Sequence, residues 1–135
     1  MKIIGIGVDI VDNQRIKKAL KNIEFIKRIF TKKEINNSKK INNFTGYYAK
    51  RFASKEALMK AIGTGFSKNI NFNDIEIVNN KLGKPSVNVS NNLKNLIKSK
   101  HNAKKYDIYL SISDEKKYSI AFVILTKIKW LKTLL

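Results

Sequence analysis

The sequence predicts a single domain of the α+β class. A strand pattern that contains two glycines lies near the N-terminus, over 2–11, and the strongest helical pattern covers about 44–62. Two further strand patterns, 107–113 and 118–127, adjoin the turn 114–117 and predict a hairpin. Strand and helix patterns grouped in this way favour the α+β class.

The first strand, KIIGIGVDIV, alternates glycine with branched residues at Gly5 and Gly7. Glycine inside a strand indicates that another backbone or a ligand approaches closely. Asp12 and Asn13 provide a helix cap, so a short helix is predicted over 13–22.

The middle of the chain predicts a succession of helices. An apolar stripe indicates a helix over 23–30. Thr31 and Glu34 have the spacing of a capping box, which predicts that another short helix begins near 32. The 44–62 helix follows.

The sequence after that helix contains both strand and helix patterns. Gly63 is placed as the C-terminal cap of the 44–62 helix. Strands are predicted at 74–79 and 86–89, with a turn between them, and a helix at 91–100.

The composition describes a basic protein without cysteine. The length of 135 residues and the hydrophobic content of 43% suit one domain, expected to span 1–127. The basic, amphipathic segment 128–135 is expected to be a C-terminal extension that packs on the body, because it is too short to hold a membrane by itself. We expect no membrane span, no signal peptide and a cytoplasmic location.

The net charge of +18 indicates an acidic partner. Nucleic acid is one possible partner. It is disfavoured because the arginines are only Arg15, Arg28 and Arg51, and because the lysines are spread along the chain instead of forming one arm. Binding of nucleic acid by a non-enzymatic module is therefore the alternative hypothesis.

Glu56 is the first candidate for chemistry. On a helical projection it lies about 20° from Ala49, about 40° from Phe52 and about 60° from Met59, within the apolar stripe. A carboxylate there is costly unless a positive group meets it. One explanation for Glu56 in this position is structural: it forms a local ion pair with Lys60, one turn further along the helix. The other is functional: it is a metal ligand or a general base.

Asp9 is the second candidate, because Asp12 is better placed to cap the following helix. Two carboxylates without cysteine describe a site of hard oxygen ligands, which suits magnesium. Lys55 and Lys60 flank Glu56, and Arg51 lies one turn before Lys55; these cations favour phosphoryl chemistry.

Four segments in order give the chain a family resemblance. They are GIGVDIVDNQRI (5–16), RFASKEALMKAIGTG (51–65), DIEIVNNKLGKPSV (74–87) and LSISDEKKYSIAFVIL (110–125). With them the chain resembles the holo-(acyl-carrier-protein) synthases, the small, trimeric class of 4′-phosphopantetheinyl transferases, from Ile3 to about Lys127. The resemblance implies an antiparallel sheet packed against the 44–62 helix, and a homotrimer with sites at subunit boundaries.

The resemblance also implies roles for individual residues. Asp9 and Glu56 match the two magnesium ligands, and these two with Lys60 match the catalytic set. Residues matched to coenzyme A binding are Arg51, Lys60, Gly63, Thr64, Gly65, Lys84 and Pro85. Arg15 matches a basic residue facing the carrier protein, on a helix that also carries Lys17 and Lys18. Asp114 stands where many members have histidine, and no histidine role is transferred to it.

The implied reaction moves 4′-phosphopantetheine from coenzyme A to a serine of an acidic apo acyl carrier protein, in support of fatty acid biosynthesis. The base is either Glu56 or a water associated with magnesium. A second alternative is a relative that binds coenzyme A without transferring from it, but neither Asp9 nor Glu56 has been lost.

Overall fold

The structure is a computed structural model, and it describes residues 1–66 and 69–128. Its elements follow the predicted order. They are β1 (Lys2–Asp12), α1 (Asn13–Ala19), α2 (Ile23–Ile29), α3 (Lys32–Ser38), α4 (Phe44–Ile62), the 3₁₀ turn η1 (Phe72–Asp74), β2 (Ile75–Asn79), β3 (Pro85–Val89), α5 (Asn91–Lys100), β4 (Tyr106–Asp114) and β5 (Tyr118–Lys127).

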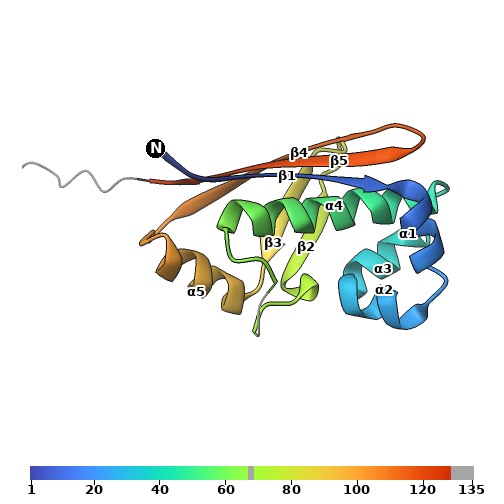
Figure 1. Ribbon diagram of the computed structural model, residues 1–135, viewed down its shortest axis with the longest axis horizontal. Coiled ribbons are helices and arrows are strands. Elements are labelled where there is room, and N and C mark those ends of the chain that lie inside the picture. The colour runs from blue at the N-terminus through green and yellow to red at the C-terminus, as the bar shows by residue number, and fades with distance from the viewer. Residues whose placement is uncertain (67–68, 129–135) are drawn as a thin grey trace, which may run out of the picture.

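The main sheet has three antiparallel strands in the order β1-β5-β4. Pairing the first strand with the last places Asp9 opposite Ala121, which in turn lies opposite Ile112 on β4. Helix α4 packs along one face of this sheet, against β1 and β5 (Figure 1). The predicted α+β fold is confirmed.

Gly5 and Gly7 explain how α4 comes so near to β1. A Cβ atom added to Gly5 would overlap the carbonyl group of Ala61, and one added to Gly7 would overlap that of Ala57. The expected close approach is therefore made by the backbone of the helix. Side chains alternate along a strand, so Asp9 lies on the same face as these glycines, toward α4.

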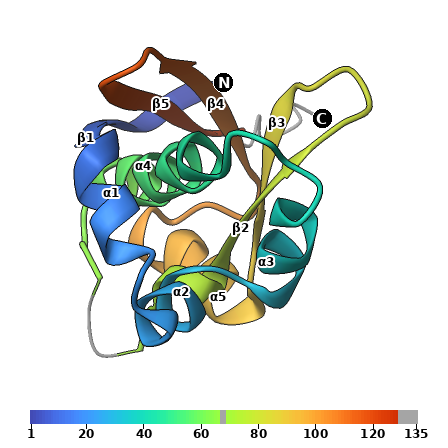
Figure 2. The same cartoon turned by 90° about the vertical axis from the view of Figure 1, so that its right-hand side faces the viewer.

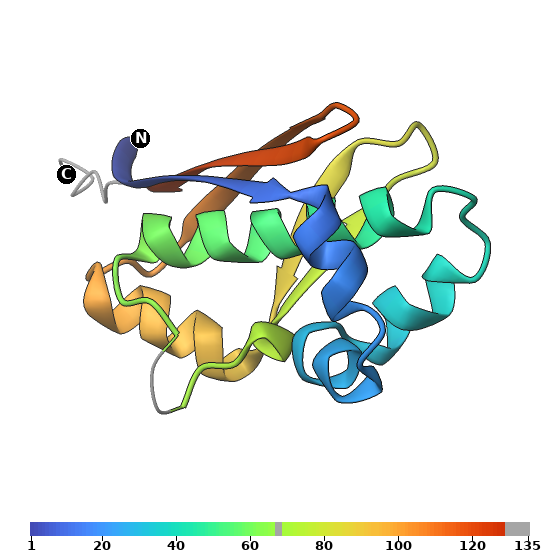
Figure 3. The same ribbon diagram turned by 45° about the vertical axis from the view of Figure 1, so that its right-hand side comes forward.

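The predicted strands do not all join one sheet, because β2 and β3 form a separate antiparallel hairpin. Figure 2 shows this hairpin beside the main sheet. Helices α1, α2 and α3 gather around the N-terminal end of α4, whereas α5 lies below its C-terminal end (Figure 3).

Most of the predicted helix boundaries agree with the structure and rest on caps that the sequence indicated, but α1 ends at Ala19 and not at the predicted position 22. The Asp12 side chain accepts a hydrogen bond from the Gln14 amide, and Thr31 with Glu34 forms the capping box of α3. Gly63 ends α4 in the left-handed conformation, with φ of 89°. Asp12, and not Asp9, is thus the cap of α1.

The outer face of the main sheet is apolar and exposed. Ile10 pairs with Ile120, Val8 with Phe122 and Ile6 with Ile124, so three apolar pairs lie in adjacent rows. Val8 is 53% exposed and Phe122 39% exposed. A contiguous apolar surface of this kind marks a contact with another molecule. We call this surface the outer face.

The predicted extension 128–135 lies outside the described residues, apart from Ile128. Within residues 1–66 and 69–128, none of the helices has the length and apolar content of a bilayer span. His101 is half-buried, and its Nε2 lies 3.1 Å from the Ile62 carbonyl oxygen. It thereby connects the ends of α5 and α4.

Candidate active site

The predicted catalytic residues meet where β1 crosses α4. Lys60 extends from α4, and its Nζ donates hydrogen bonds to Asp9 Oδ1 at 3.1 Å and to the Val8 carbonyl oxygen at 3.0 Å. The Asp9 side chain is 16% exposed and the Lys60 side chain 55% exposed. The pair therefore lies at the edge of the core, open to solvent on one side.

Glu56 stands beside this pair, half-buried on α4. Burial raises the pKa of the Glu56 carboxyl, the neighbouring Asp9 carboxylate raises it further, and the Lys60 ammonium lowers it. The local explanation, an ion pair of Glu56 with Lys60, is not what the structure shows, because Lys60 pairs with Asp9. Glu56 thus lies near enough to both Asp9 and Lys60 for each to affect its pKa, whereas the ammonium group contacts Asp9.

This donor set fits a hard divalent cation. Burial and the Asp9 carboxylate raise the pKa of Glu56, and a bound cation would relieve the repulsion between the two carboxylates. Groups of three or more metal-binding side chains do not occur in the described ranges. Magnesium often takes only one or two protein carboxylates and fills its other positions with water and phosphate oxygens, so a two-carboxylate site suits it.

Lys55 does not belong to this cluster, contrary to the sequence prediction. Its side chain is fully buried, and its Nζ donates to Glu34 Oε1 at 2.6 Å and to the Ile29 carbonyl oxygen at 2.7 Å. Burial lowers the pKa of the Lys55 ammonium, and the Glu34 carboxylate opposes that change. Lys55 is therefore unable to contact a phosphate group at the surface.

Arg51 lies apart from this cluster, in a cavity of about 400 Å³ beside the β2–β3 turn. The guanidinium donates to Asn79 Oδ1 at 2.6 Å and to the Tyr47 carbonyl oxygen at 3.3 Å, and it stacks 3.6 Å above the Tyr47 ring. Its Nε makes no hydrogen bond to any described residue. Gly83 and Pro85 line the same cavity, so a buried cation with an unused donor faces the predicted coenzyme loop.

The remaining predicted coenzyme residues are spread over two loops. Gly65, like Gly63, has positive φ, and the Thr64 hydroxyl between them is buried without a hydrogen bond in the described part of the chain. Lys84 is exposed in the β2–β3 turn, where its amide donates to Asn80 Oδ1 at 2.9 Å.

The predicted carrier-binding residues Arg15, Lys17 and Lys18 are all exposed on α1, because this helix buries Asn13 and Ile16 instead. Asp114 lies at the end of β4 and lines the Arg51 cavity. It also lines a neighbouring cavity of about 430 Å³ with Lys17.

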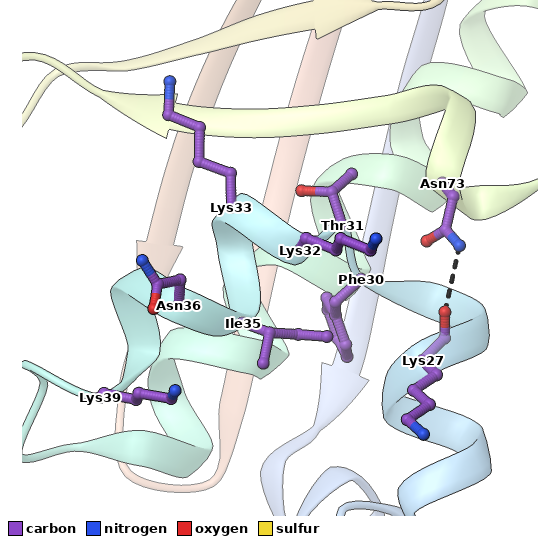
Figure 4. Close-up of a pocket in the computed structure, with 9 residues that line it drawn as sticks. All are labelled: Lys27, Phe30, Thr31, Lys32, Lys33, Ile35, Asn36, Lys39 and Asn73. Atoms are coloured by element: carbon purple, nitrogen blue, oxygen red, sulfur yellow. Dashed lines mark hydrogen bonds between the residues drawn. The ribbon is translucent and has the colours of Figure 1, made fainter.

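A larger groove, of about 1020 Å³, lies between α2 and α3 and contains none of the predicted site residues (Figure 4). Its interior includes Phe30 and Ile35, and Asn73 at one end donates to the Lys27 carbonyl oxygen at 3.1 Å. Its lysines are Lys27, Lys32, Lys33 and Lys39. These lysines add to the positive field at the α1–α3 end of the molecule.

The structure does not bring all the predicted residues into one site. Arg51 precedes Glu56 by five residues and Lys60 by nine, so on α4 it points about 140° away from the first and about 180° from the second. We call the Asp9–Glu56–Lys60 cluster the acidic half-site and the Arg51–Pro85 cavity the arginine half-site. The two half-sites lie on opposite sides of α4.

Sequence reasoning missed two residues that shape these half-sites. Asn79 holds Arg51, and Glu34 receives Lys55. A signal for Lys55 was present: Tyr48 and Ile62, both buried, lie seven residues to either side, which places Lys55 about 20° from each on the helix. No local signal pointed to Asn79.

A family model described as the 4′-phosphopantetheinyl transferase superfamily matches residues 5–123. The chain belongs to this superfamily, as the four sequence segments indicated.

Within it, the relatives are holo-(acyl-carrier-protein) synthases. The one from Pelagibacter ubique (strain HTCC1062) is 58% identical over 127 residues, covering 94% of this chain and 99% of its own. Among solved structures, the synthase from Neisseria meningitidis has a TM-score of 0.83 at 36% identity, covering 93% of this chain and 99% of its own. The synthase from Bacillus anthracis str. Ames, in complex with CoA (3′,5′-ADP), has a TM-score of 0.77 at 38% identity, covering 93% and 97%.

Proposed function

We propose that this protein transfers 4′-phosphopantetheine from coenzyme A to a serine hydroxyl of apo acyl carrier protein and releases adenosine 3′,5′-bisphosphate. Relatives that match nearly the full chain are holo-(acyl-carrier-protein) synthases, and one of them was solved with the coenzyme. The acidic half-site carries the proposal, because it places Asp9, Glu56 and Lys60 together. The product supports fatty acid biosynthesis, and we propose a cytoplasmic location.

The acidic half-site supplies three functions to this reaction. Asp9 and Glu56 would hold magnesium, which would supply positive charge to the coenzyme phosphates. Lys60, exposed at the rim, can turn its ammonium group to the transferred phosphoryl oxygens. Glu56, whose pKa is raised, or a water beside it accepts the proton of the attacking serine hydroxyl.

The direct test uses coenzyme A, magnesium and an apo acyl carrier protein. Mass spectrometry of the carrier should show the phosphopantetheine increment. An unmodified carrier, under conditions in which a known synthase modifies it, would contradict the proposal. Salt-sensitive binding of DNA or RNA that survives Glu56→Ala would favour the nucleic-acid module instead, and coenzyme binding without transfer would favour the non-transferring relative.

We also propose that the protein works as a homotrimer whose sites span subunit boundaries. The exposed outer face gives each subunit an apolar surface that a second copy can bury. The two half-sites lie on opposite sides of α4, so a single chain presents them on different parts of its surface. A cyclic arrangement would let the acidic half-site of one subunit meet the arginine half-site of the next.

Mixed trimers test this arrangement. Glu56→Gln and Arg51→Met should each inactivate a homotrimer, but co-refolding equal amounts should restore about one quarter of the wild-type activity. A site at a boundary is intact only when an Arg51→Met subunit supplies Glu56 and a Glu56→Gln subunit supplies Arg51. In random cyclic assembly each of these two positions is filled by the required variant about half of the time, so about one quarter of the sites are intact. Mixtures that stay inactive, with trimers verified by sedimentation, would place the whole site in one chain.

The exposed cations of α1 are expected to recruit the acidic carrier. The double variant Arg15→Glu/Lys17→Glu should raise KM for the carrier at least about tenfold at low salt and flatten its salt dependence, because steering by opposite charge is lost. The control is Lys94→Glu/Lys98→Glu on α5, which changes the net charge equally with cations that are also exposed. Equal effects from the two double variants would show that net charge alone matters.

A further inference from the structure

Glu34 and Lys55 form a buried ion pair that the proposed chemistry does not use. The side chains of both are 0% exposed, and their charged atoms lie 2.6 Å apart. Taking two charges out of water costs several kcal/mol for each ion, and well-packed apolar residues often stabilise a core equally well. Stability alone is therefore a weak explanation for this pair.

The Glu34 carboxylate connects three elements. Oε1 accepts from the Thr31 amide at 2.9 Å, within the capping box of α3, and from Lys55 Nζ on α4. Oε2 accepts from the Ile77 amide on β2 at 2.9 Å. A backbone amide of the hairpin is thus paired with a side chain instead of with another strand.

Two of these contacts, with Lys55 and with Ile77, lead to the half-sites. Lys55 directly precedes Glu56, so fixing Lys55 on the inner side of α4 fixes the rotation of the helix and directs Glu56 toward β1. Ile77 lies two residues before Asn79, whose Oδ1 accepts from Arg51. One buried carboxylate is therefore tied to the acidic half-site through α4 and to the arginine half-site through β2.

We propose that Glu34, through Lys55 and the Ile77 amide, is a positioning residue for both halves of the coenzyme A site. This inference rests on the proposed function. A displacement of about 1 Å from the productive geometry can cost about a hundredfold in rate, so a buried anchor between α4 and β2 has a direct effect on catalysis.

The test removes the pair and compares the result with an equally destabilised protein. Single neutral variants would leave an uncompensated buried charge, so the main variant is Glu34→Gln/Lys55→Met, and Glu34→Asp is a milder one that keeps the charge but shortens its reach. The control is Leu93→Ala or Ile97→Val, both in the buried face of α5, chosen to match the loss in free energy of unfolding measured with urea.

With all proteins folded, both Glu34 variants should lower kcat and weaken coenzyme A binding measured by calorimetry. The expected change is at least about tenfold for the double variant and about threefold for Glu34→Asp. The α5 control should keep both values within about twofold of wild type. The inference is overturned if a folded Glu34 variant matches the control.

Calorimetry separates this inference from the proposed function. If the wild type binds coenzyme A without transferring from it, the proposed function fails, and the dissociation constants of the variants still decide the role of Glu34. A wild type that does not bind coenzyme A overturns both. If the double variant does not fold, Glu34→Asp decides.

Discussion

Glu56→Gln is expected to lower kcat/KM for transfer at least about a hundredfold, because it removes the carboxylate that would hold magnesium and can accept the proton of the attacking serine hydroxyl. The free energy of unfolding should be unchanged or slightly higher. The pKa of Glu56 is raised in the folded protein by burial and by Asp9, so above its unfolded pKa the ionised carboxylate opposes folding, and a neutral amide removes that opposition. Steady-state transfer kinetics and urea unfolding at neutral pH measure the two effects.

Glu115→Gln is the matched control, because it makes the same chemical change at an exposed glutamate in the β4–β5 turn. Its activity should equal that of the wild type. A Glu56→Gln protein that transfers at the wild-type rate would remove Glu56 from the catalytic set. One that is inactive because it is unfolded would instead show that the carboxylate has a structural role.

Gly7→Ala is expected to cost at least about 4 kcal/mol in the free energy of unfolding, most of the stability of a small domain. The added methyl group would overlap the Ala57 carbonyl of α4, and a helix backbone is unable to yield as a flexible side chain would. The strand must move away from the helix, which opens the core between them. Urea unfolding followed by circular dichroism measures the loss.

Gly83→Ala provides the comparison. It adds the same methyl group where nothing lies within 4 Å, and its only cost is the positive φ of 86°. A loss of about 1 kcal/mol is expected there. If Gly7→Ala and Gly83→Ala have similar free energies of unfolding, β1 and α4 do not approach each other as closely as described.

Much of the fold could be predicted because its signals are local. The caps at Asp12, at Thr31 with Glu34, and at Gly63 depend on residues within one turn of each other, and all three are present. The glycines of β1 predicted a close approach but not its partner. The division of the strands into two sheets carried no local signal, because β1 pairs with a strand more than a hundred residues later.

The candidate site was predicted in part. Helical geometry placed Glu56 in the apolar stripe, and its burial raises its pKa as that position implies. The same geometry, applied one residue earlier, would have placed Lys55 in the core. Spacing allowed an ion pair of Lys60 with Glu56, four residues away, as one explanation, whereas Lys60 pairs with Asp9, which is 51 residues away in the chain.

By itself, the sequence determined the order of the elements, most of their ends and the residue types that carry the chemistry, because propensity, capping and periodicity act between neighbours. Only the tertiary structure decided which charges meet. Lys55 pairs with Glu34, 21 residues away in the chain, and Lys60 pairs with Asp9. Arg51 extends from the side of α4 opposite to Glu56. These outcomes depend on how one helix is rotated against its neighbours, and that rotation is set by the packing of the whole core.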